Sequence, residues 1–507
     1  MIDVADQRLR DPHSSTAWIA AVVASVACGL LVLFATRRAP QLSPDSMTYL
    51  SAAEHLRSGA GLNDFTGEPL TVFPPLYPLV LAVGGTSLVW VRIVGALAVA
   101  AATLLMSVAL RERVRPVAAL AGACAFGASQ GLVRVASAAW SEAPYAAVSL
   151  GMIVLLGTVR MTPRRAALGG LVAGLGFLTR YGGAGLVLTG LTMVVVGSGR
   201  VDARRAIRSA SAYCAVAGVI AGGWVVRNLV RTGEALGPRF EGGAGEDLAT
   251  LVGLPLRAVG ELVVGERPSD TIARIVGVVA IVALGAAAVV SLRRRPVHPL
   301  DAGMVVFAVT SLFIPVVARA LTANDIEYRV MSPMLISLVY AGTIVVDRAW
   351  HRNTIAIAGA SLASISALHG AVIAVQFPDQ AHLSTGNRAL FAPALFDAVD
   401  ELPADVTVLT NYPQGLWWQT RREPTLFAFT RPRPGNSHVP LTLDETVEQI
   451  CAGPTFLAWF AGLRNAGEGP AERRPEIVDV VDLVPERTVA GGALYRLVLR
   501  DEGSCAP

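Results

Sequence analysis

The sequence contains no lysine and has few charged side chains of any kind. Charged residues make up 16% of its 507 residues, whereas about 25% is usual in a soluble protein. Hydrophobic residues make up 53%, and they gather in blocks of about twenty, the length with which a helix crosses the apolar core of a bilayer. The composition therefore excludes an ordinary soluble protein and predicts a polytopic α-helical membrane protein.

Patterns typical of metal sites are missing as well. The sequence has neither a CxxC nor an HxxxH pattern, and its seven histidines are scattered, so no structural zinc site is predicted. Three of the five cysteines, Cys28, Cys124 and Cys214, fall in apolar runs and are expected to be small buried hydrophobic residues. Cys451 and Cys505 lie in the polar C-terminal part and can pair if that part is extracytoplasmic, although spacing alone does not show that they are close.

Eleven apolar segments have the length and hydropathy of membrane spans. They are residues 17–36, 88–110, 116–133, 144–160, 166–180, 184–198, 209–228, 272–292, 302–320, 330–347 and 354–375. The two segments within 166–198 are short and rich in glycine, so their ends are the least defined. We interpret the first segment as a retained signal anchor, because TRRAPQ follows it instead of a small-residue cleavage site.

Arginine-rich loops orient these segments, because short cytoplasmic loops carry an excess of basic residues. Such loops follow every second segment, at 111–115, 160–165, 199–208, 293–295 and 347–352. Arg37 and Arg38 lie on the opposite side, against the rule. The pattern predicts a multi-pass protein of the plasma membrane with a cytoplasmic N-terminus and everything after about residue 376 outside. Because the basic excess reflects topology, no nucleic-acid partner is predicted.

The character of the chain changes from about residue 379, where short β-branched runs such as VTVL are bounded by Pro, Asp and Asn. We therefore expect a transmembrane domain, 1–378, with a long outer loop at 37–87, and an extracytoplasmic α/β domain, 379–507. Trp417 and Trp418 in this second domain can stack on sugar rings or form a buried aromatic pair, and the buried pair is the commoner arrangement.

The first outer loop begins with a stretch, LSPDSMTYLSAAEHLRSGAG, whose pattern predicts one amphipathic helix on the outer membrane face. Ser43 suits the N-cap and Pro44 the first helical position, and the helix is expected to stop near Gly59 and Gly61. Asp45 and Tyr49 then lie one turn apart. An acid in the first turn also complements the helix dipole, so Asp45 by itself has a purely structural explanation. One apolar stripe is expected from Met47, Leu50, Ala53 and Leu56.

Ionisable and polar side chains also stand at the outer ends of other spans. They are Glu142, Arg180, Arg227, Asn228, Glu327, Tyr328 and Arg329. Each has a plain alternative, because an acid can cap a helix and an arginine at a membrane edge can reach the lipid headgroups. Ionisable groups at the edge of a span nevertheless tend to be functional, and guanidinium groups suit a phosphate in geometry and charge.

The stretch DSMTYLSAAEHLRSG, followed by FPPLYPLVLAVGG, resembles the first outer loop of the GT-C glycosyltransferases. More narrowly, it is similar to the branch that contains protein O-mannosyltransferases and the aminoarabinose transferase of lipid A. The motifs SEAPY, GLGFLTRYGG, WVVRNLVRTGEALG and EYRVMSP extend the resemblance in the same order over about residues 40–350. The C-terminal part matches this family only in its position and its general α/β style.

The resemblance implies a GT-C fold and an inverting transfer of a sugar from a polyprenyl-phosphate donor to an acceptor hydroxyl on the outer face. In this scheme Asp45 is the general base and Glu142 orients the acceptor or the sugar. Arg329, with Arg227 or Arg180 as its partner, neutralises the leaving phosphate. The residues expected to position the substrates are Tyr49, Tyr77, Asn228, Glu327 and Tyr328.

The first outer loop departs from the family pattern in its acidic residues, and this affects the expected cofactors. Many members have two adjacent acids in the first loop, whereas Asp45 is followed by Ser46, so we expect neither a catalytic metal nor another cofactor. Mannose and arabinofuranose are the expected sugars, and the acceptor can be a glycan, a lipid or a protein. The alternatives are a transporter or flippase of a lipid-linked substrate and a non-catalytic envelope assembly protein. The sequence lacks the symmetric halves common in transporters, which favours the enzyme.

Overall fold

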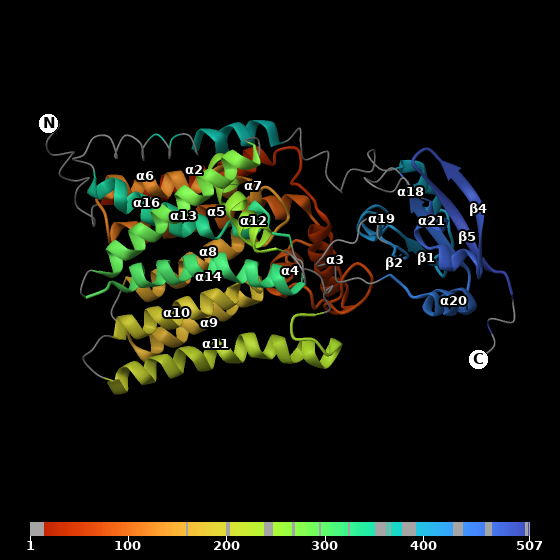
Figure 1. Cartoon of the computed structure of the whole chain (residues 1–507), viewed down its shortest axis with the longest axis horizontal. Coiled ribbons are helices and arrows are strands. Elements are labelled where there is room, and N and C mark those ends of the chain that lie inside the picture. Colours follow the sequence, from red (N-terminus) through yellow and green to blue (C-terminus); the bar gives the residue numbers. More distant parts are fainter. Residues whose placement is uncertain are drawn as a thin grey trace.

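The computed structural model describes residues 15–501 and Cys505, apart from 159–160, 199–202, 238–246, 266–268, 294–295, 323–324, 350–360, 362–363, 365–366, 378–391, 429–439 and 462–468. Over these residues, a large bundle of helices is followed by a smaller α/β part (Figure 1). The predicted boundary at residue 378 lies outside the described residues.

Ten of the predicted apolar segments coincide with a helix or a pair of helices, and much of the eleventh, 354–375, lies outside the described residues. The helices are α2 (Ser15–Ala35), α5 (Leu88–Arg111), α6 (Pro116–Gly127) with α7 (Gln130–Ala136), α8 (Glu142–Gly157), α9 (Pro163–Thr179), α10 (Gly183–Ser198), α11 (Ala203–Thr232), α13 (Asp270–Leu292), α14 (Pro299–Thr322), α16 (Met334–Arg348) and, overlapping the eleventh segment, the helix Ala367–Phe377. Among the described residues, five of these helices are long and apolar enough to cross a membrane, or six if α6 and α7 form one span. The count of eleven spans stays a prediction.

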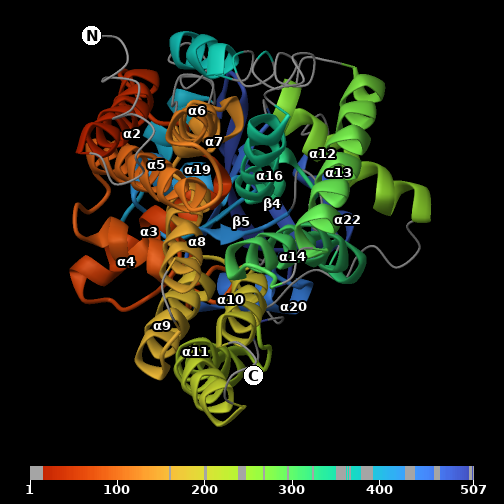
Figure 2. The ribbon, with the colours of Figure 1, turned by 90° about the vertical axis from the view of Figure 1, so that its left-hand side faces the viewer.

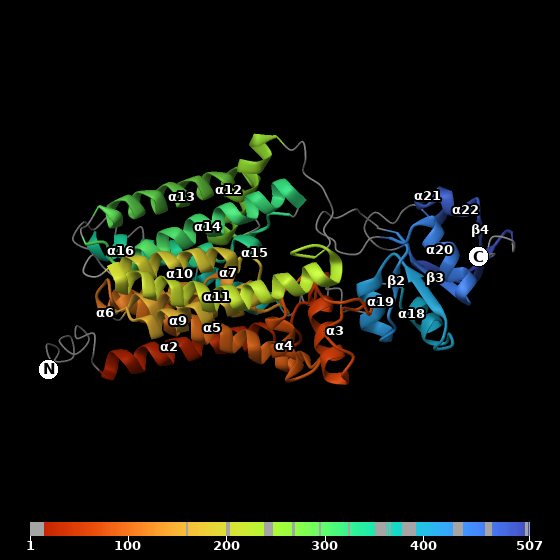
Figure 3. The same ribbon diagram turned by 90° about the horizontal axis from the view of Figure 1, so that it is seen from below.

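The long helices lie side by side (Figures 2 and 3). The helices at the edge of the bundle leave apolar side chains uncovered. Over its most apolar stretch α5 is 61% buried, whereas α13 is only 11% buried. Side chains such as Val219 on α11 and Val282 on α13 are 75% and 65% exposed. Contiguous apolar surface of this kind is unfavourable in water and suits lipid. The chain is therefore a multi-pass membrane protein.

The predicted span 116–133 is not a straight helix. It is divided into α6 and α7, which are bent by 48° relative to each other. The Ser129 hydroxyl donates a hydrogen bond of 2.7 Å to the carbonyl of Phe126 and accepts one of 3.4 Å from the backbone N–H of Leu132. A serine side chain that replaces main-chain hydrogen bonds in this way ends one helix and begins the next.

The connection 229–271 contains a helix that the sequence did not predict. Helix α12 (Leu248–Val264) packs along α13, and two glycines allow the close approach. A Cβ atom on Gly260 would lie 1.8 Å from the carbonyl oxygen of Ala273, and one on Gly277 would lie 1.8 Å from that of Leu256. The apolar run LATLVGLPLRAVGELVV could have indicated this helix, but the proline inside it argued against a helix.

The predicted helix of the first outer loop is confirmed as α3 (Pro44–Ser58), and α4 (Leu76–Ala82) follows it. Ser43 caps α3, with its hydroxyl accepting from the backbone of Ser46 while the Ser46 hydroxyl accepts from the backbone of Ser43. Gly59 ends the helix with a φ of 80°, a conformation that favours glycine. Helix α3 crosses the end of the bundle and separates it from the C-terminal α/β part (Figure 1).

The C-terminal α/β part, which we define as residues 393–501, is built on a five-stranded sheet in the order β2-β1-β3-β5-β4. Strand β1 is parallel to β2 and β3, whereas β5 is antiparallel to β3 and β4. Two separate apolar clusters pack against this sheet. Its strands and helices are α18 (Pro393–Asp400), β1 (Thr407–Thr410), α19 (Pro413–Thr420), β2 (Thr425–Leu426), α20 (Leu443–Ala452), β3 (Thr455–Phe460), α21 (Pro470–Arg473), α22 (Pro475–Val478), β4 (Val481–Val489) and β5 (Gly492–Leu499).

Cys451 and Cys505 form a disulfide with a Cα–Cα separation of 5.5 Å. The sequence had left open whether these two cysteines pair. Of the three other cysteines, Cys28 is buried and Cys124 is half-buried. The prediction that all three are buried is wrong for Cys214, which is exposed. Its helix, α11, lies at the edge of the bundle and has only 22% of its most apolar stretch buried.

Candidate active site

The loop before α3 is fastened to the loop before α8 by main-chain hydrogen bonds. The backbone N–H of Gln41 donates to the carbonyl of Ser137 at 2.9 Å, and Gln41 forms an isolated parallel bridge with Ala138. The indole N–H of Trp140 donates to the hydroxyl of Ser43, the N-cap of α3, at 2.8 Å. These contacts bring two segments about a hundred residues apart to one place, and each of them carries a predicted acid.

Asp45, in the first turn of α3, forms an ion pair with Arg329 of the short helix α15 (Tyr328–Met331). A carboxylate oxygen of Asp45 lies 2.6 Å from the Nη1 atom of Arg329, and the two side chains are 28% and 24% exposed. The face of the Trp140 ring lies 5.0 Å from the guanidinium carbon. Both charged groups are thus held in place and still reachable from outside.

Glu327 adds a second acid beside Arg329. One of its carboxylate oxygens lies 3.3 Å from the Nε atom of Arg329, and its side chain is 53% exposed. Burial alone would lower the pKa of Arg329, but the charges of Asp45, Glu142 and Glu327 raise it above its ordinary value. The guanidinium is therefore a permanent cation at any physiological pH.

Glu142, the first residue of α8, is paired with Arg180, which follows the last turn of α9. The Glu142 side chain is only 3% exposed, so this carboxylate depends on its partner to remain in a buried position. Arg180 also interacts electrostatically with Tyr49 and Arg329, and Arg329 interacts with Glu142. The structure therefore joins the two ion pairs into one network, which we call the Asp45 network.

Aromatic rings form one wall of this network. The Tyr49 hydroxyl shares a hydrogen bond of 3.2 Å with that of Ser141, and its ring contacts those of Phe73 and Tyr77 at 4.8 and 5.0 Å between centroids. Burial, followed by the charge of Glu142, raises the pKa of Tyr49 well above its ordinary value, and burial does the same for Tyr77. Both hydroxyls are therefore neutral hydrogen-bonding groups.

The structure does not bring Arg227 and Asn228 into the Asp45 network. Arg227 donates to the carbonyl of Leu70 at 2.7 Å and stacks on its own helix neighbour Trp224. Asn228 is fully buried and donates to the Tyr181 hydroxyl at 2.9 Å. Both residues instead fasten the C-terminal end of α11 to the loop 37–87, a structural role that the sequence had not predicted.

Replacing Asn228 with alanine is expected to destabilise the protein by about 1–3 kcal/mol, because buried partners lose their hydrogen bonds. The partners include the Tyr181 hydroxyl and the carbonyl of Ala235. Asn63→Ala is a matched control, since the Asn63 amide makes one exposed hydrogen bond to Ala60. Thermal unfolding in detergent measures both variants, and an equal, small shift for the two would contradict the structural role.

Two residues of the site were missed from the sequence. Arg134, in the last turn of α7, places its guanidinium 4.8 Å from the ring centre of Tyr328, which is 8% exposed and directly precedes Arg329. Trp140 contacts both Arg329 and Ser43. The signal for Arg134 was its place at the outer end of an apolar segment, the same criterion that had selected Arg227.

Acidic and basic side chains are combined in and beside the Asp45 network. Three acids and three arginines meet there, namely Asp45, Glu142, Glu327, Arg134, Arg180 and Arg329. Over the described part of the chain, no group of three or more His, Cys, Asp and Glu side chains is arranged to hold a metal ion. Chemistry that places negative charge on a substrate therefore has guanidinium groups available to stabilise it.

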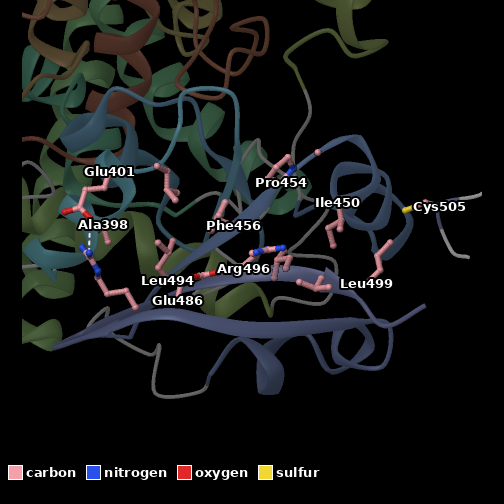
Figure 4. A pocket seen from close by; sticks show the side chains of 15 residues that line it. Ala398, Glu401, Ile450, Pro454, Phe456, Glu486, Leu494, Arg496, Leu499 and Cys505 are labelled. Atoms are coloured by element: carbon pink, nitrogen blue, oxygen red, sulfur yellow. Dashed lines mark ion pairs between the residues drawn. The ribbon is translucent and has the colours of Figure 1, made fainter. Parts of the chain in front are cut away.

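A separate hollow lies within the C-terminal α/β part (Figure 4). This groove has a volume of about 780 Å³, and Phe456, Leu494 and Arg496 are among the residues that line it. At its edge Glu401 forms an ion pair of 2.8 Å with Arg487. None of its lining residues belongs to the Asp45 network, so the groove is distinct from the candidate active site.

The fold of this chain is similar to that of known membrane enzymes. No protein-family model matches the chain, and no curated protein matches it in sequence. Among solved structures, ArnT from Cupriavidus metallidurans bound to undecaprenyl phosphate matches with a TM-score of 0.63 and 13% identity, covering 97% of this chain and 100% of that one. These two chains therefore share a fold over almost their entire lengths.

Two other structures match less closely. The archaeal oligosaccharyltransferase AglB from Archaeoglobus fulgidus has a TM-score of 0.54 and 12% identity, covering 94% of this chain and 74% of that one. The arabinofuranosyltransferase AftD from Mycobacteria has a TM-score of 0.54 and 14% identity, covering 95% and 40%. All three are GT-C glycosyltransferases. The chain has the GT-C fold, so the predicted resemblance is confirmed at this level.

Proposed function

We propose that the protein is an inverting glycosyltransferase that moves a sugar from a polyprenyl-phosphate donor to an acceptor hydroxyl. The observation that carries the proposal is the 2.6 Å pair of Asp45 and Arg329 at the partly exposed end of the bundle. A group that accepts a proton and a cation that binds phosphate lie side by side there. When the acceptor hydroxyl attacks the sugar on the face opposite the leaving phosphate, the base and the phosphate-binding cation must lie no further apart than about the width of one sugar ring.

The ion pair suggests how the site changes when the donor binds. In the free protein, Asp45 and Arg329 neutralise each other. A donor phosphate that takes over the guanidinium of Arg329 frees the Asp45 carboxylate to accept the acceptor proton. The acceptor oxygen then bonds to the anomeric carbon, the bond from that carbon to the phosphate oxygen breaks, and polyprenyl phosphate leaves with its charge held by arginine.

The other residues take supporting roles in this scheme. Arg134 replaces Arg227 as the proposed partner of Arg329, because it stacks on the adjacent Tyr328. Glu142 orients the sugar or the acceptor, and Arg180 holds that buried carboxylate in place. Glu327 and the two tyrosine hydroxyls of the aromatic wall bind the substrates by hydrogen bonds.

We propose further that the site and residues 379–507, as a separate domain, lie outside the cell. The arginine-rich loops support this orientation. So does the Cys451–Cys505 disulfide, because disulfides persist mainly in oxidising compartments. Asp45 lies at the end of the bundle that faces the C-terminal α/β part, so one orientation places both on the same side (Figure 1).

This orientation predicts how the two cysteines react. In right-side-out membrane vesicles, a membrane-impermeant maleimide is expected to label Cys451 and Cys505 only after reduction. Cys451→Ser together with Cys505→Ser is the control that removes the signal while retaining Cys28, Cys124 and Cys214. Labelling that needs inverted or opened vesicles would place the disulfide on the cytoplasmic side and overturn the orientation.

Mannose and arabinofuranose are the sugars we propose for the donor. ArnT and AglB are described with undecaprenyl phosphate and dolichol-phosphate, and AftD is an arabinofuranosyltransferase, which supports a lipid-linked donor. The acceptor is a glycan, a lipid or a protein of the cell envelope, which matches a site at the end of the bundle beside a soluble α/β part.

The proposal is tested by sugar transfer in lipid-reconstituted protein. Radiolabelled polyprenyl-phosphate mannose and polyprenyl-phosphate arabinofuranose are offered separately with envelope extracts, and transfer to an acceptor with release of polyprenyl phosphate is expected from one of them. Protein-free vesicles provide the background. Movement of intact donor between leaflets without release of polyprenyl phosphate would instead identify a flippase. Binding of envelope material with neither reaction would identify an assembly protein.

A further inference from the structure

Helix α3 is packed on two sides, and one side is supplied by the C-terminal α/β part. Trp417, on α19, is 2% exposed. It belongs to the apolar cluster that contains Met47, Tyr49 and Leu50 of α3, together with Tyr77. A residue from the far end of the sequence therefore completes the core of the first outer loop.

Charged contacts surround this tryptophan. The guanidinium of Arg421 lies 4.6 Å from the ring centre of Trp417 and 4.4 Å from that of Trp418, and it forms an ion pair of 3.4 Å with Glu54 of α3. Arg421 has a φ of 57°, a strained conformation for a residue with a side chain, which persists where surrounding contacts fix it. Glu423 lies 3.2 Å from His55 of the same helix.

The N-terminal half of α3 also contacts the segment that leads into α8 and carries Glu142 of the Asp45 network. Its N-cap, Ser43, is bound by Trp140, and Tyr49 is hydrogen-bonded to Ser141, the residue before Glu142. Because a helix moves as a stiff unit, a shift of α3 where it packs on Trp417 also moves its first turn. Asp45 lies in that first turn.

We propose that Trp417 is a positioning residue of the transferase site, which holds α3 so that Asp45 meets the acceptor. The proposal rests on the proposed function for its effect on rate, but its structural part does not. A misplacement of about 1 Å of a reacting group can cost about 10²-fold in rate. Trp417 is buried and packs in one cluster with residues of α3, so it acts through this helix.

The test compares four variants of the full chain in lipid. Trp417→Ala is expected to lower kcat by about 10- to 100-fold while KM for the donor stays within about twofold, because donor contacts are intact and only the base is displaced. Trp417→Phe, which keeps an aromatic ring in the cluster, is expected to restore most of the rate. Arg421→Ala should lower kcat less than Trp417→Ala does. Arg487→Ala is its matched control, because the Arg487–Glu401 pair is similarly exposed and contacts no part of α3.

A second readout separates positioning from general stability. Hydrogen–deuterium exchange of Pro44–Ser58 should increase at least severalfold in Trp417→Ala, while exchange in buried α5 stays at the wild-type level. If exchange in α3 is unchanged in Trp417→Ala, the inference is overturned, whatever the rate of sugar transfer. It is also overturned if the kcat of Trp417→Phe is as low as that of Trp417→Ala. If wild type transfers no sugar, the proposed function fails, and the exchange result alone decides whether Trp417 holds α3.

Discussion

Replacing Asp45 with asparagine is expected to lower the rate of sugar transfer by about 10²- to 10⁴-fold, the range typical for loss of a general base. Asparagine has nearly the same shape as aspartate, and its Oδ1 atom can still accept a hydrogen bond from Arg329 at the 2.6 Å contact. It cannot take up a proton at neutral pH. The expected result is therefore a loss in kcat with a folded protein and a nearly unchanged KM for the donor.

Asp325→Asn provides the matched control for this variant. Asp325 also pairs with an arginine, Arg319, at 2.9 Å, but it is 62% exposed and stands outside the Asp45 network. The control should keep the wild-type rate and melting temperature. Asp45→Asn and Asp325→Asn are compared by their initial rates of transfer with saturating acceptor and by their thermal unfolding. Transfer by Asp45→Asn within about twofold of wild type would remove Asp45 from the role of base, because that role requires at least about 10²-fold.

Replacing Arg329 with alanine is expected to lower kcat/KM by about 10²- to 10³-fold, as for loss of one preorganised group that stabilises developing charge. Arg329 is the partner of Asp45, its Nε atom faces Glu327, and its charge is fixed by three acids. Affinity for polyprenyl phosphate should fall as well, because the same guanidinium binds the product. Arg329→Lys should recover part of the rate, since lysine restores the charge without the planar fork.

Two comparisons separate this effect from loss of structure. Arg319→Ala removes an arginine whose partner is Asp325 and should leave both transfer and lipid-phosphate binding unchanged. The double variant of Asp45→Asn with Arg329→Ala should be about as slow as the slower single variant, because residues that act as one unit are not additive. Fully additive losses in the double variant, or unchanged binding of polyprenyl phosphate by Arg329→Ala, would contradict a shared phosphate-and-base site.

The first outer loop shows what the sequence determines locally. The cap at Ser43 and the proline after it predicted where α3 begins, and the glycines at 59 and 61 predicted about where it ends, because each acts through its own backbone or its nearest neighbours. The long apolar helices were predictable for a similar reason, since length and composition set them. The bend between α6 and α7 was not, because both pieces are equally apolar and one serine side chain decides the break.

The partners within the site depended on information that a single sequence does not hold. Arg134 and Arg227 both stand at the outer end of an apolar helix, yet only Arg134 lies beside the Asp45 network. The rotation of a helix about its axis is set by packing against its neighbours, and the local pattern of residues leaves it undetermined. The same holds for the pairing of Glu142 with Arg180.

Trp417 illustrates a third limit. The sequence favoured a buried aromatic pair inside a small domain, and Trp417 is indeed buried, with its ring centre 6.1 Å from that of Trp418. It is buried against α3, however, and not within the core of its own sheet. Composition predicts that a tryptophan is covered, but contacts between parts of a chain that are hundreds of residues apart decide what covers it.

The ion pair of Asp45 and Arg329 joins residues 284 positions apart, so it has a consequence for biosynthesis. Asp45 leaves the ribosome early, whereas Arg329 follows only after nine of the eleven predicted membrane segments have been made. In the proposed mechanism, a nascent or truncated chain would therefore carry the base without the cation that binds the donor. Such a chain would be unable to transfer the sugar of a lipid-linked donor to water, and catalytic competence would arise only once membrane insertion is nearly complete.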